Sequence, residues 1–173
     1  IRNAINLAAT SNVKELYFPA GTYYVRNSSF ANSSAVDYSN ITFRGVGEGS
    51  VLKRLESSIS GSINPGLFNF TGQGNQGAIE GIRFRSIVFD GNRSSTSSLV
   101  GPTSGSIDPS RSTAESLVFL KYATNIAITE CRFMDSGGPG VHAEYSSAII
   151  LTNNIFSKLG RSYEQIGRAT LNS

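Results

Sequence analysis

Pairs of apolar residues separated by one position recur along the chain and predict repeated β-strands. Because side chains two positions apart lie on the same face of a strand, each pair would point into one core. Successive pairs are 25, 41, 44 and 23 residues apart, so we predict a solenoid whose two longer coils carry loops. The pairs are Leu16 and Phe18, Ile41 and Phe43, Ile82 and Phe84, Ile126 and Ile128, and Ile149 and Leu151.

The last three coils match in more detail, because a bend follows each pair and an aromatic residue opens the next strand. A β-sandwich also alternates apolar and polar residues, but it does not need such aligned columns. Stacked coils bury their apolar faces on one another, which favours the solenoid. The matching positions are Ile82, Phe84, Ile87 and Phe89; then Ile126, Ile128, Cys131 and Phe133; then Ile149, Leu151, Asn154 and Phe156.

Residues 1–12 have apolar side chains at helical spacing and predict an amphipathic helix that caps the open end of the solenoid. The Ser- and Asn-rich residues 27–39 are interpreted as a loop, and residues 92–114 as a long polar excursion. Strands are expected within 13–26, at 41–44, 51–53 and 67–70, and within 116–123, 125–135, 141–145 and 148–156.

The 173 residues suit one β-helix domain, with the capping helix at 1–12 and coils over 13–161. Residues 162–173 contain no further apolar pair, and their structure is not assigned. No C-terminal cap is evident either. We therefore expect this domain to be a segment of a longer chain, or its end to be covered by a partner chain.

The surface is polar but weakly charged, since 16% of residues are charged and 38 are Ser or Thr. With a net charge of only +3 and no basic block, nucleic acid is not an expected partner. The chain contains no run of 18 apolar residues, so no membrane span is predicted. No cofactor or metal is expected. The single cysteine, Cys131, falls in a predicted core column and is interpreted as a packing residue.

Several segments resemble the pectate-lyase-like right-handed parallel β-helix superfamily. Leu16-Tyr-Phe-Pro-Ala-Gly-Thr-Tyr23 after an Ala-rich helix is similar to its opening, and three later segments are similar to its coils. The resemblance implies an all-β, single-stranded, right-handed helix of three sheets with a sugar-binding groove outside. The coil-like segments begin at Ile41, Asn125 and Ile149.

The superfamily includes polysaccharide lyases, glycoside hydrolases and bacteriophage tailspikes, and its viral members are usually trimers. The Asp-Asp step and Gly-His-Gly of polygalacturonase-like members are absent here, and Val141-His-Ala is a poor match. The leading hypothesis is thus a tailspike-like or receptor-binding virion protein, a homotrimer that binds and in some members degrades host polysaccharide. A secreted lyase or hydrolase, placed outside the cell, and a non-catalytic spacer or adhesin are the alternatives.

Candidate chemistry rests on acids that neighbouring coils could bring together, because coils stack about 4.8 Å apart and glycoside hydrolysis usually needs two carboxyl groups. Asp90 and Asp135 occupy similar corners, although both also suit turns that bond their own backbone. The catalytic candidates are Asp90, Asp135, His142 and Glu144, and the substrate-binding candidates are Arg83, Arg85, Tyr122 and Tyr145.

Overall fold

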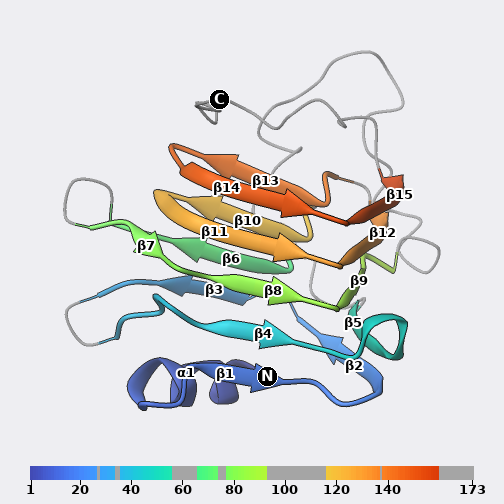
Figure 1. Ribbon diagram of the computed structural model, residues 1–173, viewed down its shortest axis with the longest axis horizontal. Helices are drawn as coiled ribbons and strands as arrows, with labels where there is room; N and C mark the ends of the chain where they lie inside the picture. The colour runs from blue at the N-terminus through green and yellow to red at the C-terminus, as the bar shows by residue number, and fades with distance from the viewer. Residues whose placement is uncertain are drawn as a thin grey trace.

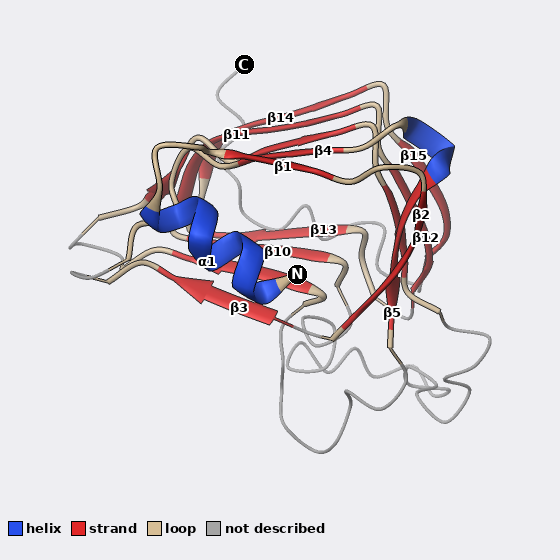
Figure 2. Cartoon of the chain, turned by 90° about the horizontal axis from the view of Figure 1, so that it is seen from below, coloured by secondary structure: helices blue, strands red, loops and turns tan. Residues whose placement is uncertain are grey.

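The chain winds through three parallel sheets in turn and forms a right-handed parallel β-helix (Figures 1 and 2). This computed structural model describes residues 1–26, 28–33, 36–55, 66–73, 77–92, 116–136 and 138–159. In Figure 1 the coils lie one above another, and in Figure 2, seen from below, the sheets form three sides around the core. The predicted all-β solenoid is confirmed.

Each coil contributes its strands to the three sheets in the same order. The first sheet holds β1 (Glu15–Tyr17), β4 (Thr42–Arg44), β8 (Arg83–Arg85), β11 (Ala123–Thr129) and β14 (Ser147–Thr152), with β7 (Ile79–Glu80) beside β11. The second sheet holds β2 (Gly21–Val25), β5 (Ser50–Arg54), β9 (Val88–Asp90), β12 (Arg132–Ser136) and β15 (Ile155–Leu159). The third sheet holds β3 (Ser28–Ala31), β6 (Phe68–Thr71), β10 (Val118–Lys121) and β13 (Val141–Glu144).

Inward side chains stack from coil to coil in each sheet, as the apolar columns predicted. In the second sheet, Phe133 lies between Phe89 and Phe156, with ring centroids 4.9 and 5.0 Å apart and nearly parallel planes. Burying one such side chain contributes about 1.5–3 kcal/mol, so a column of them stabilises the stack strongly. The first-sheet column runs through Leu16, Phe43, Phe84, Ile128 and Leu151.

The register of the first coil differs from the prediction by two residues. Leu16 pairs with Phe43 rather than with Ile41, and the Phe18 N–H donates to the Arg44 carbonyl at 2.8 Å. A slip of two residues keeps every side chain on its original face, so the apolar pattern alone could not distinguish the two registers. Phe18 lies beyond the strand and packs edge-on against Tyr23, with ring centroids 5.5 Å apart.

The N-terminal segment forms the predicted helix, α1 (Arg2–Thr10), which lies across the end of the stack in Figure 2. Its apolar face buries Ile5, Ala8 and Ala9, and Ile5 and Ala9 join the central core. Just beyond the helix, Lys14 Nζ donates to the Ala9 carbonyl at 2.7 Å, where a cation favours the helix C-terminus. The helix therefore covers core side chains that the first coil would otherwise expose.

Residues 28–31 were expected to be part of a loop, and this expectation was wrong, because they form β3. Phe30 is buried, with its ring stacked against Phe70 at 5.1 Å and near Phe68 at 6.4 Å. Parallel pairing with β6 thus overrides a composition that is otherwise typical of loops. Residues 93–114 of the predicted polar excursion and residues 162–173 lie outside the described part of the chain.

The bend from the first to the second sheet has one left-handed residue at the same place in three successive coils. Ser86, Glu130 and Asn153 all have φ of 55°, and they follow paired positions of β8, β11 and β14. One coil earlier this place is taken by Gly45, where a Cβ would lie 2.4 Å from the Ser86 carbonyl oxygen. The short 3-10 helix η1 (Gly47–Gly49) follows Gly45 and projects Glu48 beside the next coils. None of the described helices is long and apolar enough to span a membrane.

Candidate functional site

The structure places the four predicted catalytic residues on two different sheets. Asp90 ends β9 and Asp135 lies in β12, both in the second sheet, whereas His142 and Glu144 lie on β13 in the third sheet. Within the described residues, no hydrogen bond or ion pair links the two aspartates to the other two residues. The catalytic role of each stays a prediction.

Asp90 is engaged locally. Its side chain is mostly buried and lies 3.0 Å from Lys53 Nζ, and its Oδ1 accepts a 2.7 Å hydrogen bond from the Asn92 N–H. This backbone bond is the turn interaction that an Asp at such a corner favours. Asp135 is one position further along its coil, because Asp90 pairs with Met134.

Asp135 has a left-handed backbone, with φ of 51°, and lies 3.7 Å from the exposed Lys158 Nζ. Exposed ion pairs of this kind contribute little to stability, typically about 0–1 kcal/mol. The structure therefore holds Asp135 less firmly than Asp90.

His142, Glu144 and Lys121 gather on the outer side of the third sheet. Glu144 pairs with Lys121 in the parallel ladder, and its carboxylate lies 3.5 Å from Lys121 Nζ and 3.5 Å from His142 Nε2. Burial lowers the pKa of His142, and the nearby Glu144 carboxylate opposes that shift. His142 is only 5% exposed, and its Nδ1 has no hydrogen-bond partner in the described part of the chain.

Two tyrosines stack directly beside these charges. The rings of Tyr122 and Tyr145 have centroids 5.2 Å apart and planes 18° from parallel, and Lys121 Nζ lies 5.7 and 5.8 Å from the two centroids. Both residues have left-handed backbones, which turn them out of the strand ends. Tyr145 is 71% exposed. We call Lys121, Tyr122, His142, Glu144 and Tyr145 the corner cluster.

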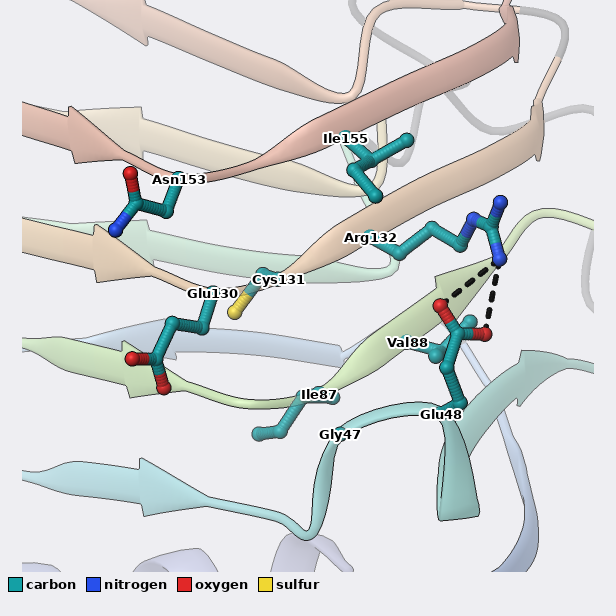
Figure 3. Close-up of a pocket in the computed structure, with 9 residues that line it drawn as sticks. All are labelled: Gly47, Glu48, Ile87, Val88, Glu130, Cys131, Arg132, Asn153 and Ile155. Atoms are coloured by element: carbon teal, nitrogen blue, oxygen red, sulfur yellow. Dashed lines mark hydrogen bonds and ion pairs between the residues drawn. The ribbon is translucent and has the colours of Figure 1, made fainter.

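A concave feature separate from the corner cluster lies on the outer side of the bend between the first and second sheets (Figure 3). It is a hollow of about 210 Å³. The Arg132 side chain lies along one rim of the hollow, and its Nη1 donates to both carboxylate oxygens of Glu48 at 2.9 Å. The hollow is lined by Gly47, Glu48, Ile87, Val88, Glu130, Cys131, Arg132, Asn153 and Ile155.

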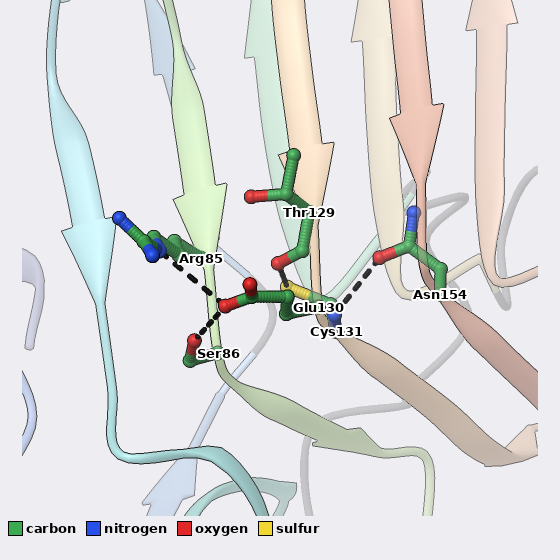
Figure 4. Close-up of polar contacts among 6 residues, drawn as sticks. All are labelled: Arg85, Ser86, Thr129, Glu130, Cys131 and Asn154. Atoms are coloured by element: carbon green, nitrogen blue, oxygen red, sulfur yellow. Dashed lines mark hydrogen bonds and ion pairs between the residues drawn. The ribbon is translucent and has the colours of Figure 1, made fainter.

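The predicted arginines lie on the outer face of β8, each with a local partner. Arg83 donates to the carbonyl and side-chain oxygens of Asn125. Arg85 Nε lies 3.4 Å from Glu130 Oε2, to which Ser86 Oγ also donates at 2.8 Å (Figure 4). The Ser86 hydrogen bond and then Arg85 hold the pKa of the exposed Glu130 carboxyl below its usual value. A glycan carboxylate would have to compete with these contacts.

Lys121 was not among the predicted site residues, although the coil period could have found it. It precedes Glu144 by 23 residues, the step between the last two apolar pairs, and Tyr122 precedes Tyr145 by the same step. Glu48 and Arg132, by contrast, are 84 residues apart, and no sequence signal connects them. Among the described residues, no group of three or more His, Cys, Asp or Glu side chains could hold a metal ion.

Comparisons with known proteins support the fold. No family model matches the sequence, and no curated protein matches it either. One similar solved structure is the crystal structure of a putative glycosyl hydrolase from Parabacteroides merdae ATCC 43184, with a TM-score of 0.59 and 15% sequence identity. The match covers 83% of this chain and 59% of that protein, so this chain spans less than two thirds of its neighbour's length. At this identity the likeness shows a shared architecture.

Proposed function

We propose that this chain is a polysaccharide-binding β-helix that holds its glycan at the corner cluster. The observation that carries the proposal is the stack of the exposed Tyr145 on the half-buried Tyr122, beside Lys121 and Glu144. A flat apolar ring with charged hydrogen-bonding groups next to it matches a sugar, which has a C–H face and a rim of hydroxyls. The name of the structural neighbour, a putative glycosyl hydrolase, agrees with a role on polysaccharides.

The arrangement supports binding better than hydrolysis. Glycoside hydrolysis usually takes two carboxyl groups about 5–10 Å apart. Glu144 is the only carboxylate in the corner cluster, and Asp90 and Asp135 lie on the second sheet. A glycan-binding surface needs no such pair, so binding is the primary function that we propose.

Cleavage by a lyase or hydrolase is the second candidate. It is favoured by His142, a buried imidazole whose lowered pKa keeps it neutral and whose Nε2 lies 3.5 Å from Glu144. A neutral imidazole can accept a proton, and Glu144 would orient it. Replacing Asp135 and Glu144 together with Ala is expected to abolish cleavage, and an unchanged rate would remove both residues from the chemistry.

A matched pair of variants tests the binding site. The protein is screened against immobilised neutral and acidic polysaccharides, and Tyr145→Ala is compared with Tyr24→Ala, which removes a similarly exposed tyrosine from the second sheet. Losing a stacking ring should weaken binding at least about tenfold, whereas Tyr24→Ala should leave it unchanged. Equal affinities for the two variants would contradict the site, and no binding across the panel would contradict the function.

We propose that the chain with this binding function belongs to a bacteriophage tailspike-like virion protein. The resemblance of its coil sequences to that superfamily and the Ser- and Asn-rich composition support this setting. A secreted extracellular protein and a non-catalytic spacer or adhesin stay the alternatives. The mass of the protein in solution tests the tailspike setting, because a stable homotrimer is expected there and a monomer would argue against it.

A further inference from the structure

Each carboxylate at the rim of the hollow in Figure 3 is neutralised by an ion pair. Glu48 pairs with Arg132, and Glu130, on the other side of the hollow, pairs with Arg85 (Figures 3 and 4). Both carboxylates that line the hollow are thus paired with a guanidinium group, although Arg85 itself does not line it. Such a rim favours a neutral ligand rich in hydrogen-bonding groups over an anion or a cation.

The hollow also presents an apolar wall that the fold does not bury. Ile155 is 51% exposed although it begins β15, where it pairs with Arg132, which in turn pairs with Val88. Ile87 and Val88 lie deeper and are nearly covered. An exposed apolar side chain beside paired charges suits a ligand with one apolar face and one polar edge.

The polar groups are held in place before any ligand arrives. Glu48 is presented by η1, and both of its carboxylate oxygens accept from Arg132 Nη1 at 2.9 Å across coils that are distant in sequence. Arg132 Nε is buried and has no hydrogen-bond partner within the described residues. Preorganised groups bind with less loss of side-chain freedom.

We propose that this hollow is a second glycan subsite, which takes one neutral pyranose ring of a polysaccharide. The C–H face of the ring packs on the exposed side chain of Ile155. Its hydroxyls donate to the carboxylates of Glu48 and Glu130 and accept from the guanidinium of Arg132. Because a hydroxyl both donates and accepts, it joins an ion pair without breaking it.

The size of the hollow limits the occupant to a single ring. Its volume of about 210 Å³ lies below the roughly 300–1,000 Å³ that is typical of sites for larger ligands. The hollow lies at the junction of the first and second sheets, whereas the corner cluster lies on the third. A polymer that reached both would bind more tightly than to either alone.

Methyl-group NMR spectra of the protein, titrated with neutral methyl glycosides of glucose, galactose and N-acetylglucosamine, test the subsite. We expect the methyl signals of Ile155, Ile87 and Val88 to shift with at least one of them, with a dissociation constant on the order of 1–10 mM, as suits one ring. Ile155→Ser should weaken this binding at least about fivefold. Ile150→Ser, which changes an equally exposed isoleucine on β14, is the matched control and should leave it unchanged.

Three results would overturn the subsite. They are no methyl shift with any neutral glycoside, equal affinities of Ile155→Ser and Ile150→Ser, or tighter binding of methyl galacturonide than of methyl galactoside. Thermal melting of each variant confirms that it is folded. Because Tyr145→Ala leaves the hollow intact, loss of binding in that variant alone would concern the corner cluster, so the two proposals fail separately.

Discussion

Asn154 completes the backbone pairing of Cys131 across the bend between the first and second sheets (Figure 4). The Cys131 N–H donates to Asn154 Oδ1 at 2.8 Å, and Asn154 Nδ2 donates to the Ile128 carbonyl at 2.7 Å. One side chain therefore satisfies a donor and an acceptor of the coil below it, at a place where the strands are interrupted.

Replacing Asn154 with Ala should lower the free energy of unfolding by about 1–3 kcal/mol, because both backbone groups would lose their partner. Urea denaturation measures the change. Thr152→Ala, an exposed substitution two positions earlier, is the control and should stay within about 0.5 kcal/mol of the parent. An equally mild effect of Asn154→Ala would show that water replaces the amide.

Substitutions in the phenylalanine column of the second sheet should lower the free energy of unfolding by different amounts at different positions. Phe133→Ala should cost about 3–5 kcal/mol, because the ring is fully buried between two others. Phe156 is 45% exposed, so Phe156→Ala should cost about half as much. Denaturation midpoints of the two variants test this order, and a larger loss at Phe156 would reverse it.

Acidification should weaken the fold through His142. Burial keeps the pKa of this imidazole below its ordinary value of 6.5, so the unfolded chain binds a proton at a higher pH than the folded chain does. Stability contributed by the neutral form is present above pH 6.5 and is lost as the pH falls below it, by at most about 1.4 kcal/mol per pH unit. The comparison is urea denaturation at pH 7.5 and 5.5, with His142→Gln expected to lose less stability on acidification. An identical pH dependence in both proteins would remove His142 as the cause.

Cys131 should resist alkylation in the folded protein. Burial raises the pKa of its thiol to about 11, and only the thiolate reacts. Iodoacetamide at pH 8, followed by mass spectrometry, should modify the native chain at least about a hundredfold more slowly than the chain in urea. Comparable rates in the two conditions would mean that the bend opens readily.

The stack could be predicted from the sequence because apolar residues recur at equivalent positions of successive coils, for example Phe84 and Ile128 or Phe89 and Phe133. It misplaced Leu16 by two positions because such a slip leaves the in-and-out pattern unchanged. It also missed β3, whose single buried aromatic, Phe30, gives no alternating pattern to detect.

The candidate site was predicted only in part. His142 with Glu144, and Tyr122 with Tyr145, come together because each pair belongs to one strand or one column of the ladder. Asp90 and Asp135 share a sheet, but Asp135 lies one position beyond Met134, the ladder partner of Asp90. The Glu48–Arg132 pair depends on where η1 projects, which strand periodicity does not encode.

The uninterrupted coil between Ile126 and its ladder partner Ile149 has a consequence for how such a chain can change length. These partners are 23 residues apart, and the same interval separates Val118 from Val141 and Arg132 from Ile155. Deleting that whole interval would bring equivalent side chains back into line, whereas deleting one residue would turn every later side chain of its strand inside out. This fold can therefore gain or lose whole coils, but it does not tolerate single-residue insertions within strands.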